Sequence, residues 1–363
     1  MTLPRTRLTE ALGCRYPIIQ TAMGWVSDSN LVIATTQAGG FGFLAGATID
    51  ASELENEIKR VVAATGGSNF GLNFHMFQEN AAQCIDLAIE YRLKAVSYGR
   101  GPDKETIARF KAAGVLCIPT VGALKHALKA IELGADMITI QGAEGGGHTG
   151  GVPSTILLPQ VLDAVTVPVI AAGGYSTGRG LASALAAGAE GIAMGTRFMM
   201  TSDSPTPKKT LDRYLAIHDT QQIRVTLAVD GMRHRMVDNE FIRHLESKGP
   251  IGRLWIALRS ARQWKAQTGM STRHMIKTFF SAIKDDPSAM SQVVMAANQP
   301  VLLQRSMVEG FPAEGILPSG QVAAAIDDLP SCAELINSIV AEAEQCFERL
   351  QTRCVSPTDI ESE

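Results

Sequence analysis

Between residues 17 and 198 the chain alternates short apolar runs with amphipathic stretches, and this rhythm limits the folds open to it. The apolar runs predict eight strands, at 17–23, 41–45, 70–74, 95–99, 116–121, 137–142, 168–174 and 191–198. Three helix-to-strand junctions carry Gly114, Gly134 and Gly188, where a helix C-terminus favours a left-handed residue. Strands and helices that alternate in this way form parallel crossover units.

Eight such units within about 200 residues fit a closed barrel better than an open, doubly wound sheet. We therefore expect an α/β fold, a (β/α)8 TIM barrel, over residues 1–216. Residues 217–307 would form a mainly helical insertion, a lid over the barrel mouth, with a small β piece at 224–229 and 232–236. Residues 308–363 would return to the barrel through a final helix at 332–350.

Composition excludes several classes of protein. Of the 363 residues, 45% are hydrophobic and 19% are charged, which allows a large core and disfavours disorder. The net charge of −3 argues against general nucleic-acid binding. The six cysteines lack C-x-x-C spacing, so we expect reduced thiols in a cytoplasmic protein and no metal site. Neither a signal peptide nor a membrane span is expected, and a homo-oligomer remains open.

Active sites of such barrels lie at the C-terminal ends of the strands. The residues found there are Ala22, Met23 and Gly24 after the first strand, Asn73 on the third, Gln141 on the sixth, Gly173 and Gly174 after the seventh, and Gly195 and Thr196 in the eighth. Barrels often bind phosphate after strands seven and eight, with help from a helix N-terminus. We expect the two glycine turns, and the helix that begins near residue 177, to offer free backbone N–H groups; alternatively, these glycines only make tight turns.

One histidine, His148, follows the sixth strand in a loop that carries glycine at 145, 146, 147, 150 and 151. Glycine lets the backbone approach a flat ligand closely. A titratable imidazole in such a loop is a candidate acid or base. The alternative is a solvated loop residue with no catalytic role.

Residues 248–284 contain no Asp or Glu and carry a block of positive charge that includes Arg253, Arg259, Arg262 and Lys265. In an acidic protein this block favours an anionic partner, such as the phosphates of CoA or of an acyl-carrier group. A solvated helical face with its countercharges elsewhere is the alternative.

Four stretches, at 17–24, 141–150, 172–174 and 194–198, together resemble the nitronate monooxygenase superfamily. The resemblance covers nearly the whole chain and implies a (β/α)8 barrel with FMN at the strand C-termini. It implies that Gly173, Gly174, Gly195 and Thr196 hold the FMN phosphate. The rest of the implied cofactor-binding set is Ala22, Met23, Gly24, Asn73, Gln141, Gly146, Gly147 and Ala172. His148 would face the flavin as the proton-transfer residue.

The superfamily contains several chemistries. Nitronate monooxygenases proper usually read Glu-Ala-Gly-Gly-His-Arg-Gly in the histidine loop, from which residues 144–150 depart. A second branch reduces enoyl thioesters, and a third acts on CoA thioesters of residual steroid rings. The stretches at 147–155, 201–204 and 294–298 are most similar to the third.

The resemblance therefore implies an FMN-dependent oxidoreductase that dehydrogenates or reduces a C–C bond of a steroid-ring-derived acyl-CoA. The alternatives are a nitronate monooxygenase, an enoyl-thioester reductase that uses reduced nicotinamide, and a non-catalytic barrel that binds a phosphate ligand.

Overall fold

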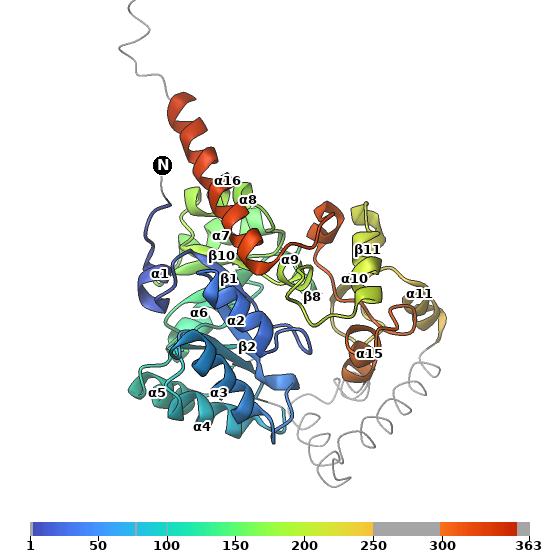
Figure 1. The fold of residues 1–363 in the computed structure, drawn as a ribbon, viewed down its shortest axis with the longest axis horizontal. Coiled ribbons are helices and arrows are strands. Elements are labelled where there is room, and N and C mark those ends of the chain that lie inside the picture. The colour runs from blue at the N-terminus through green and yellow to red at the C-terminus, as the bar shows by residue number, and fades with distance from the viewer. Residues whose placement is uncertain (1–2, 77, 100, 250–297, 354–363) are drawn as a thin grey trace, which may run out of the picture.

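The computed structural model describes residues 3–76, 78–99, 101–249 and 298–353 (Figure 1). Its centre is one parallel sheet in the order β5-β4-β3-β2-β1-β10-β9-β7-β6. The bounds of these strands are β1 Ile18–Gln20, β2 Phe41–Ala45, β3 Gly71–Phe74, β4 Ala95–Tyr98, β5 Leu116–Cys117, β6 Thr120–Val121, β7 Ile138–Gln141, β9 Val169–Ala172 and β10 Gly191–Met194. Most of these residues are buried, as expected for a parallel sheet covered by helices.

The two ends of this sheet meet in residues 116–121. β5 pairs with β4 and β6 pairs with β7, although both belong to this single predicted strand. Pro119 divides it because proline has no N–H to donate. The ladders nevertheless continue, since the Ile118 N–H donates to the Val96 carbonyl at 2.9 Å and the Pro119 carbonyl accepts from Thr139 at 2.9 Å. The sheet therefore closes on itself, and the predicted (β/α)8 barrel is confirmed.

Helices follow the barrel strands along the chain. They are α2 Ser29–Gln37, α3 Leu54–Thr65, α4 Ala81–Glu90, α5 Lys104–Ala112, α6 Leu124–Leu133, α7 Ser154–Leu162 and α8 Gly178–Ala186. Asp28 and Asp103 cap α2 and α5 by accepting hydrogen bonds from backbone N–H groups of the first turn. Gly114, Gly134 and Gly188 have φ of +75°, +111° and +101°, which confirms their predicted part in ending helices.

Strand residues alternate between the barrel interior and the layer under the helices. Ile19 and Ile170 belong to the inner cluster, whereas their neighbours Ile18 and Val169 pack against helices. The inner cluster also contains Leu8 and Leu12 from the short helix α1 (Arg7–Leu12). The interior of the barrel is thus a packed core. The mouth of the barrel is where an active site can lie.

A second, three-stranded sheet lies beside the barrel in the order β11-β12-β8 (Figure 1). Its strands are β8 Gly147–His148, β11 Ile223–Thr226 and β12 His234–Val237, of which the last two replace the predicted β piece with shifted bounds. Around it are α10 Lys208–Leu215, η2 Thr220–Gln222, α11 Glu240–Ser247, α15 Asn298–Met307 and η4 Gln321–Ala325. The helices predicted for the lid fall mostly on residues 250–297, outside the described residues, and the domain division stays a prediction.

The last described helix, α16 (Cys332–Arg353), packs against α8 and α2 (Figure 1). The contact with α8 is close, because a Cβ on Gly178 would lie 2.3 Å from the Ile339 carbonyl oxygen. Among the described helices, none combines the length and the apolar character that crossing a membrane requires.

Several predicted bounds were wrong. The eighth strand ends at Met194, and Gly195 caps a short helix, α9 (Thr196–Met199), so Gly195 and Thr196 lie after the strand. The chain forms a helical turn there, closed by the bond from the Met199 N–H to the Gly195 carbonyl, and Phe198 on this turn is buried in the core. β1 is shorter than predicted because residues 23–27 form a hydrogen-bonded turn.

Candidate functional site

The carboxyl ends of four neighbouring barrel strands form one side of the mouth. Gln141 is paired with Ala172 across β7 and β9, and Gln20 with Met194 across β1 and β10. Beyond the strands the chain stays close together, since a Cβ on Gly195 would lie 3.1 Å from Thr21 Oγ1 and 3.5 Å from Met23 Sδ. Parallel pairing thus brings together residues that the sequence separates by more than 170 positions.

The turn after β9 requires glycine. Gly173 and Gly174 have φ of +95° and +84°, and a Cβ on Gly173 would lie 2.9 Å from the backbone nitrogen of Gly142. The N–H groups of Gly173, Gly174 and Gly195 donate to no acceptor within the described part of the chain. They are therefore available to an anionic group at the ends of β9 and β10.

The N-terminus of α8 differs from our expectation. The N–H of Gly178 donates to the Glu342 carboxylate of α16 at 2.7 Å, and Arg179 forms an ion pair with the same carboxylate at 2.9 Å. Thr177 accepts from Gly180 and caps the helix. Because a carboxylate of this chain already occupies this helix end, the prediction that it offers free donors to a phosphate was wrong.

The glycine loop after β7 is held at several points. Gln141 Nε2 donates to the His148 carbonyl at 3.0 Å. Glu144 accepts from the N–H of Ser154 at 3.0 Å and from its hydroxyl at 2.9 Å. A Cβ on Gly146 would lie 2.5 Å from the backbone nitrogen of Gly320, so the segment at 319–320 covers the loop there. The loop is therefore fixed by packing as well as by its glycines.

The end of the same loop is a strand. β8 pairs antiparallel with β12, with His148 opposite His234 and Gly147 opposite Arg235. The N–H of Thr149 extends the ladder by donating to the Arg233 carbonyl at 3.1 Å. His148 is thus held by backbone bonds to a segment more than 80 residues later in the sequence.

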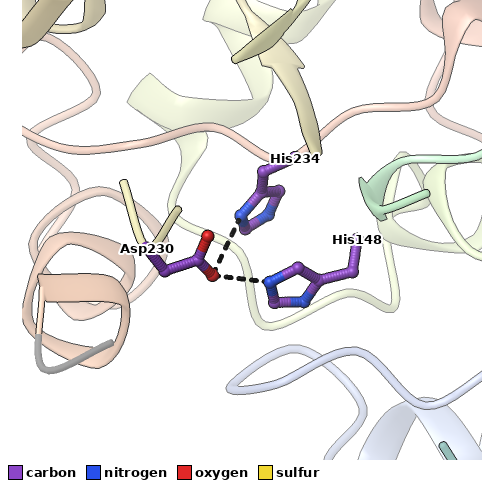
Figure 2. Close-up of side chains that lie close together, drawn as sticks. All are labelled: His148, Asp230 and His234. Atoms are coloured by element: carbon purple, nitrogen blue, oxygen red, sulfur yellow. Dashed lines mark hydrogen bonds and ion pairs between the residues drawn. The ribbon is translucent and has the colours of Figure 1, made fainter. Parts of the chain in front are cut away.

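This pairing assembles three titratable side chains, His148, Asp230 and His234, which we call the His–Asp–His trio (Figure 2). His148 Nε2 lies 2.5 Å from Asp230 Oδ2, and His234 Nδ1 lies 4.0 Å from the same oxygen. The two imidazole rings stack with centroids 4.6 Å apart at an interplanar angle of 29°. The side chain of His148 is 41% exposed, whereas that of Asp230 is fully buried.

The surroundings decide which members of the trio are charged. Burial acts to raise the pKa of Asp230, but the hydrogen bond and charge of His148, with the Met232 N–H, hold that pKa below its usual value. Burial, together with the charge of His148, lowers the pKa of His234 to about 4. At neutral pH Asp230 is therefore an anion and His234 is neutral. Nδ1 of His234 has no hydrogen-bond partner in the described structure.

Nε2 of His148, Oδ2 of Asp230 and Nδ1 of His234 lie within 4.8 Å of one another, as three ligands of a metal could. Imidazole and carboxylate suit divalent transition metals. However, two ligands of a tetrahedral zinc ion lie roughly 3.4 Å apart. The 2.5 Å contact between His148 and Asp230 is instead the length of a charge-assisted hydrogen bond, and we interpret the trio as hydrogen-bonded.

The opposite side of the mouth is made by β3 and β4. Asn73 Nδ2 donates to the Ser97 carbonyl at 3.0 Å. His75 comes directly after β3, and desolvation together with the charge of His148 lowers the pKa of His75. After β1, Gly24 lies against Thr48, whose methyl group would be 3.0 Å from a Cβ on Gly24.

The structure brings together Met23, Gly195, Gly173, Gly174, Gln141 and His148 around one mouth, with Asn73 on its far side. Arg253, Arg259, Arg262 and Lys265 lie outside the described residues. Asp230, His234 and His75 were missed by sequence reasoning. The only local signal was Asp230–Gly231 followed by a histidine four residues after the aspartate, which is too common a pattern to single out.

Comparison with known proteins places the chain in a family. The family described as nitronate monooxygenase matches residues 5–88 and 75–342. The chain is 46% identical to a (3aS,4S,5R,7aS)-5-hydroxy-7a-methyl-1-oxo-octahydro-1H-indene-4-carboxyl-CoA dehydrogenase of Rhodococcus jostii, over 94% of this chain and 97% of that protein. It is also 46% identical to the protein of that name from Mycobacterium tuberculosis, over 93% of this chain and 96% of that one.

Among solved structures, FabK from Thermotoga maritima matches with a TM-score of 0.79 and 27% identity, over 96% of this chain and 99% of that one. The chain therefore belongs to the nitronate monooxygenase family, and it is an oxidoreductase of that flavin-dependent family.

Proposed function

We propose that the protein is an FMN-dependent dehydrogenase of a CoA thioester whose acyl group derives from steroid rings, with His148 as the proton-transfer residue. The observation that carries this proposal is the His–Asp–His trio, which holds an exposed imidazole against a buried carboxylate beside the glycine turns of the mouth. The names of the Rhodococcus and Mycobacterium relatives support the class of substrate.

The mouth has features that fit FMN. The unpaired N–H groups of Gly173, Gly174 and Gly195 would hold the phosphate, with Thr196 beside them. Ala22, Met23, Gly24, Asn73, Gln141, Gly147 and Ala172 would line the ring and the ribityl chain. Gly146, which is covered by residues 319–320, would instead serve the packing of the loop. When bound, FMN accepts or returns a hydride equivalent.

His148 would exchange a proton with the carbon next to the thioester. A thioester acidifies this carbon, so one base at hydrogen-bond distance is sufficient. Because Nε2 of His148 is bonded to Asp230, the proton would pass through Nδ1, which makes no hydrogen bond with any described residue. In Figure 2 this nitrogen points away from both Asp230 and His234.

The CoA moiety would need cationic partners outside the barrel core. Arg253, Arg259, Arg262 and Lys265 are our proposal for this role, since CoA carries several phosphate charges. The acid-free composition of residues 248–284 supports it. Replacing all four by Gln should raise the KM for an acyl-CoA more than it changes kcat.

A nitronate monooxygenase is the second candidate, favoured by the family itself. His148 would then take a proton from a nitroalkane or face its nitronate, and oxygen would reoxidise the flavin. The histidine loop, with Gly145 and Thr149 where those enzymes usually carry alanine and arginine, favours the CoA-ester chemistry. An enoyl-thioester reductase that uses reduced nicotinamide is the same chemistry in the opposite direction.

The first test is an anaerobic visible spectrum of the purified protein, titrated separately with a steroid-derived acyl-CoA and with an alkyl nitronate. We expect the acyl-CoA alone to bleach the flavin band. His148→Ala should slow this bleaching roughly 10²-fold to 10⁴-fold, the usual contribution of a general base.

His244→Ala, on the exposed face of α11, is the matched control and should bleach at the wild-type rate. Bleaching by the nitronate alone would assign the protein to the second candidate. A protein purified without any flavin would contradict both.

A further inference from the structure

The trio contains two residues, Asp230 and His234, that the proposed proton transfer does not itself require. Asp230 is 1% exposed and lies in the turn between β11 and β12. Its Oδ1 accepts from the Met232 N–H at 3.0 Å, which fixes the carboxylate in the turn, and its Oδ2 faces His148. A buried carboxylate is costly unless it is bonded in this way.

We propose that Asp230 is the positioning residue of His148: it holds the imidazole as the Nε2–H tautomer and so leaves Nδ1 as the atom that takes and returns the proton. The proposal deepens the proposed function and rests on it for the identity of the reaction. The carboxylate can only accept, so the Nε2 atom at 2.5 Å must carry the hydrogen. Asp230 keeps its charge throughout, and the proton moves between substrate carbon and Nδ1.

The surrounding groups also disfavour the charged form of the two imidazoles next to His148. The groups that face it are Asp230 from the turn, His234 from β12 and His75 from the end of β3. Of these imidazoles only His148 has a carboxylate at hydrogen-bond distance, since His234 Nδ1 is 4.0 Å from Asp230 Oδ2. A proton on His148 disfavours a second on either neighbour, because like charges repel at such distances.

His234 is neutral, and it also restricts the orientation of the His148 ring. It is 1% exposed, and its ring lies nearly parallel to that of His148. Stacking on one side and the Asp230 bond at one edge leave the His148 ring few orientations. Positioning of this kind raises kcat because the base is already aligned when substrate binds.

The test uses the flavin-loaded protein with ¹⁵N-labelled histidine. The nitrogen shifts of neutral His148 should report the Nε2–H tautomer, and His234 should remain neutral from pH 8 down to about pH 5. Neither readout needs a substrate, so the proposal can stand even if no CoA thioester reduces the flavin. A neutral His148 in the Nδ1–H form, or a His234 that protonates together with it, would overturn the assignment.

Asp230→Asn supplies the second readout. We expect kcat for flavin reduction to fall about 10-fold to 100-fold, the worth of one charge-assisted hydrogen bond, while KM changes little. The pH profile of flavin reduction should change as well, because the imidazole loses its carboxylate partner. The tautomer preference of His148 should weaken in parallel.

Asp238→Asn is the matched control in the same hairpin region. Asp238 forms ion pairs with Arg224 and Arg243, at 3.5 and 3.1 Å, and belongs to no part of the trio. It should leave the pH profile and the His148 tautomer unchanged. Equal effects of Asp230→Asn and Asp238→Asn, or a wild-type pH profile in Asp230→Asn, would show that Asp230 serves only the fold.

Discussion

Two neighbouring parts of the barrel mouth, which we call its backbone side and its side-chain side, are built from different materials. At the ends of β9 and β10 the surface is backbone: Gly173, Gly174 and Gly195 present N–H groups and no side chains. Beside the end of β7 it is side chain: an imidazole, a carboxylate and a second imidazole in mutual contact. The first side depends on local conformation, whereas the second depends on segments that meet only after the whole chain has folded.

This difference predicts that the backbone side tolerates the least change. Gly173→Ala combines a φ of +95° with a Cβ 2.9 Å from a backbone nitrogen, so the chain must move. We expect a loss of about 3 kcal/mol or more in the free energy of unfolding, together with loss of bound flavin. Denaturant titration and the flavin-to-protein ratio measure the two effects.

Gly114→Ala separates strain from contact. Gly114 has a φ of +75°, but a Cβ there would meet nothing within 4 Å. It should lose only about 1 kcal/mol and retain its flavin. If the two variants lose stability equally, the close approach of the β9 turn to Gly142 has no special importance.

The side-chain side should be the more sensitive to acid. The pKa of His234 is about 4 in the folded protein, against about 6.5 for an unfolded histidine. As pH falls from 6.5 to 4 the unfolded chain gains a proton that the folded chain does not. Stability therefore falls over this window, by on the order of 3 kcal/mol from this residue. The lowered pKa of Asp230 acts in the same direction at lower pH.

His234→Gln should flatten this dependence. Its free energy of unfolding should change less between pH 7 and pH 5 than that of the wild type, measured by denaturant titration at both values. His244→Gln, at an exposed position of α11, should keep the wild-type slope. An unchanged slope in His234→Gln would mean that the buried imidazole is not a source of acid sensitivity.

The smallest effect should come from the bond between Gln141, at the end of β7, and the histidine loop. Gln141→Leu removes the donor to the His148 carbonyl while it keeps the size of the side chain. One neutral hydrogen bond is worth about 0.5–1.5 kcal/mol, so we expect turnover to fall roughly 2-fold to 10-fold. Gln37→Leu removes a similar bond from an exposed Gln37 to the Ala64 carbonyl, far from the mouth, and should leave turnover unchanged.

The same difference explains what could be predicted from the sequence. Local sequence patterns, such as β-branched runs and glycine at helix ends, determine the barrel strands and the glycine turns. The positions of these elements were therefore predicted with errors of a few residues. The end of β10 was misplaced because buried apolar residues continue through the short helix α9, so the apolar pattern does not mark where the strand ends. The carboxylate on α8 could not be predicted, since Glu342 reaches Gly178 from 164 residues away.

Asp230 and His234 could not be identified from local sequence patterns for a related reason. Their pairing with His148 depends on the register between β8 and β12, and a shift by one residue would turn His234 to the other face of the strand. The sequence contains no short-range signal for that register. The motif around His148 could be found from the sequence, whereas the side chains that contact His148 could be identified only from the folded structure.

The antiparallel pairing of β8 with β12 also sets an order of assembly during synthesis. All eight barrel strands are complete once Met194 has emerged, yet the strand partner of His148 ends at Val237 and its cover at Gly320 follows later still. A nascent chain can therefore close its barrel while its histidine loop is still unconstrained. The His–Asp–His trio is therefore assembled only after the barrel strands have been made, and a fragment ending after β10 would lack it.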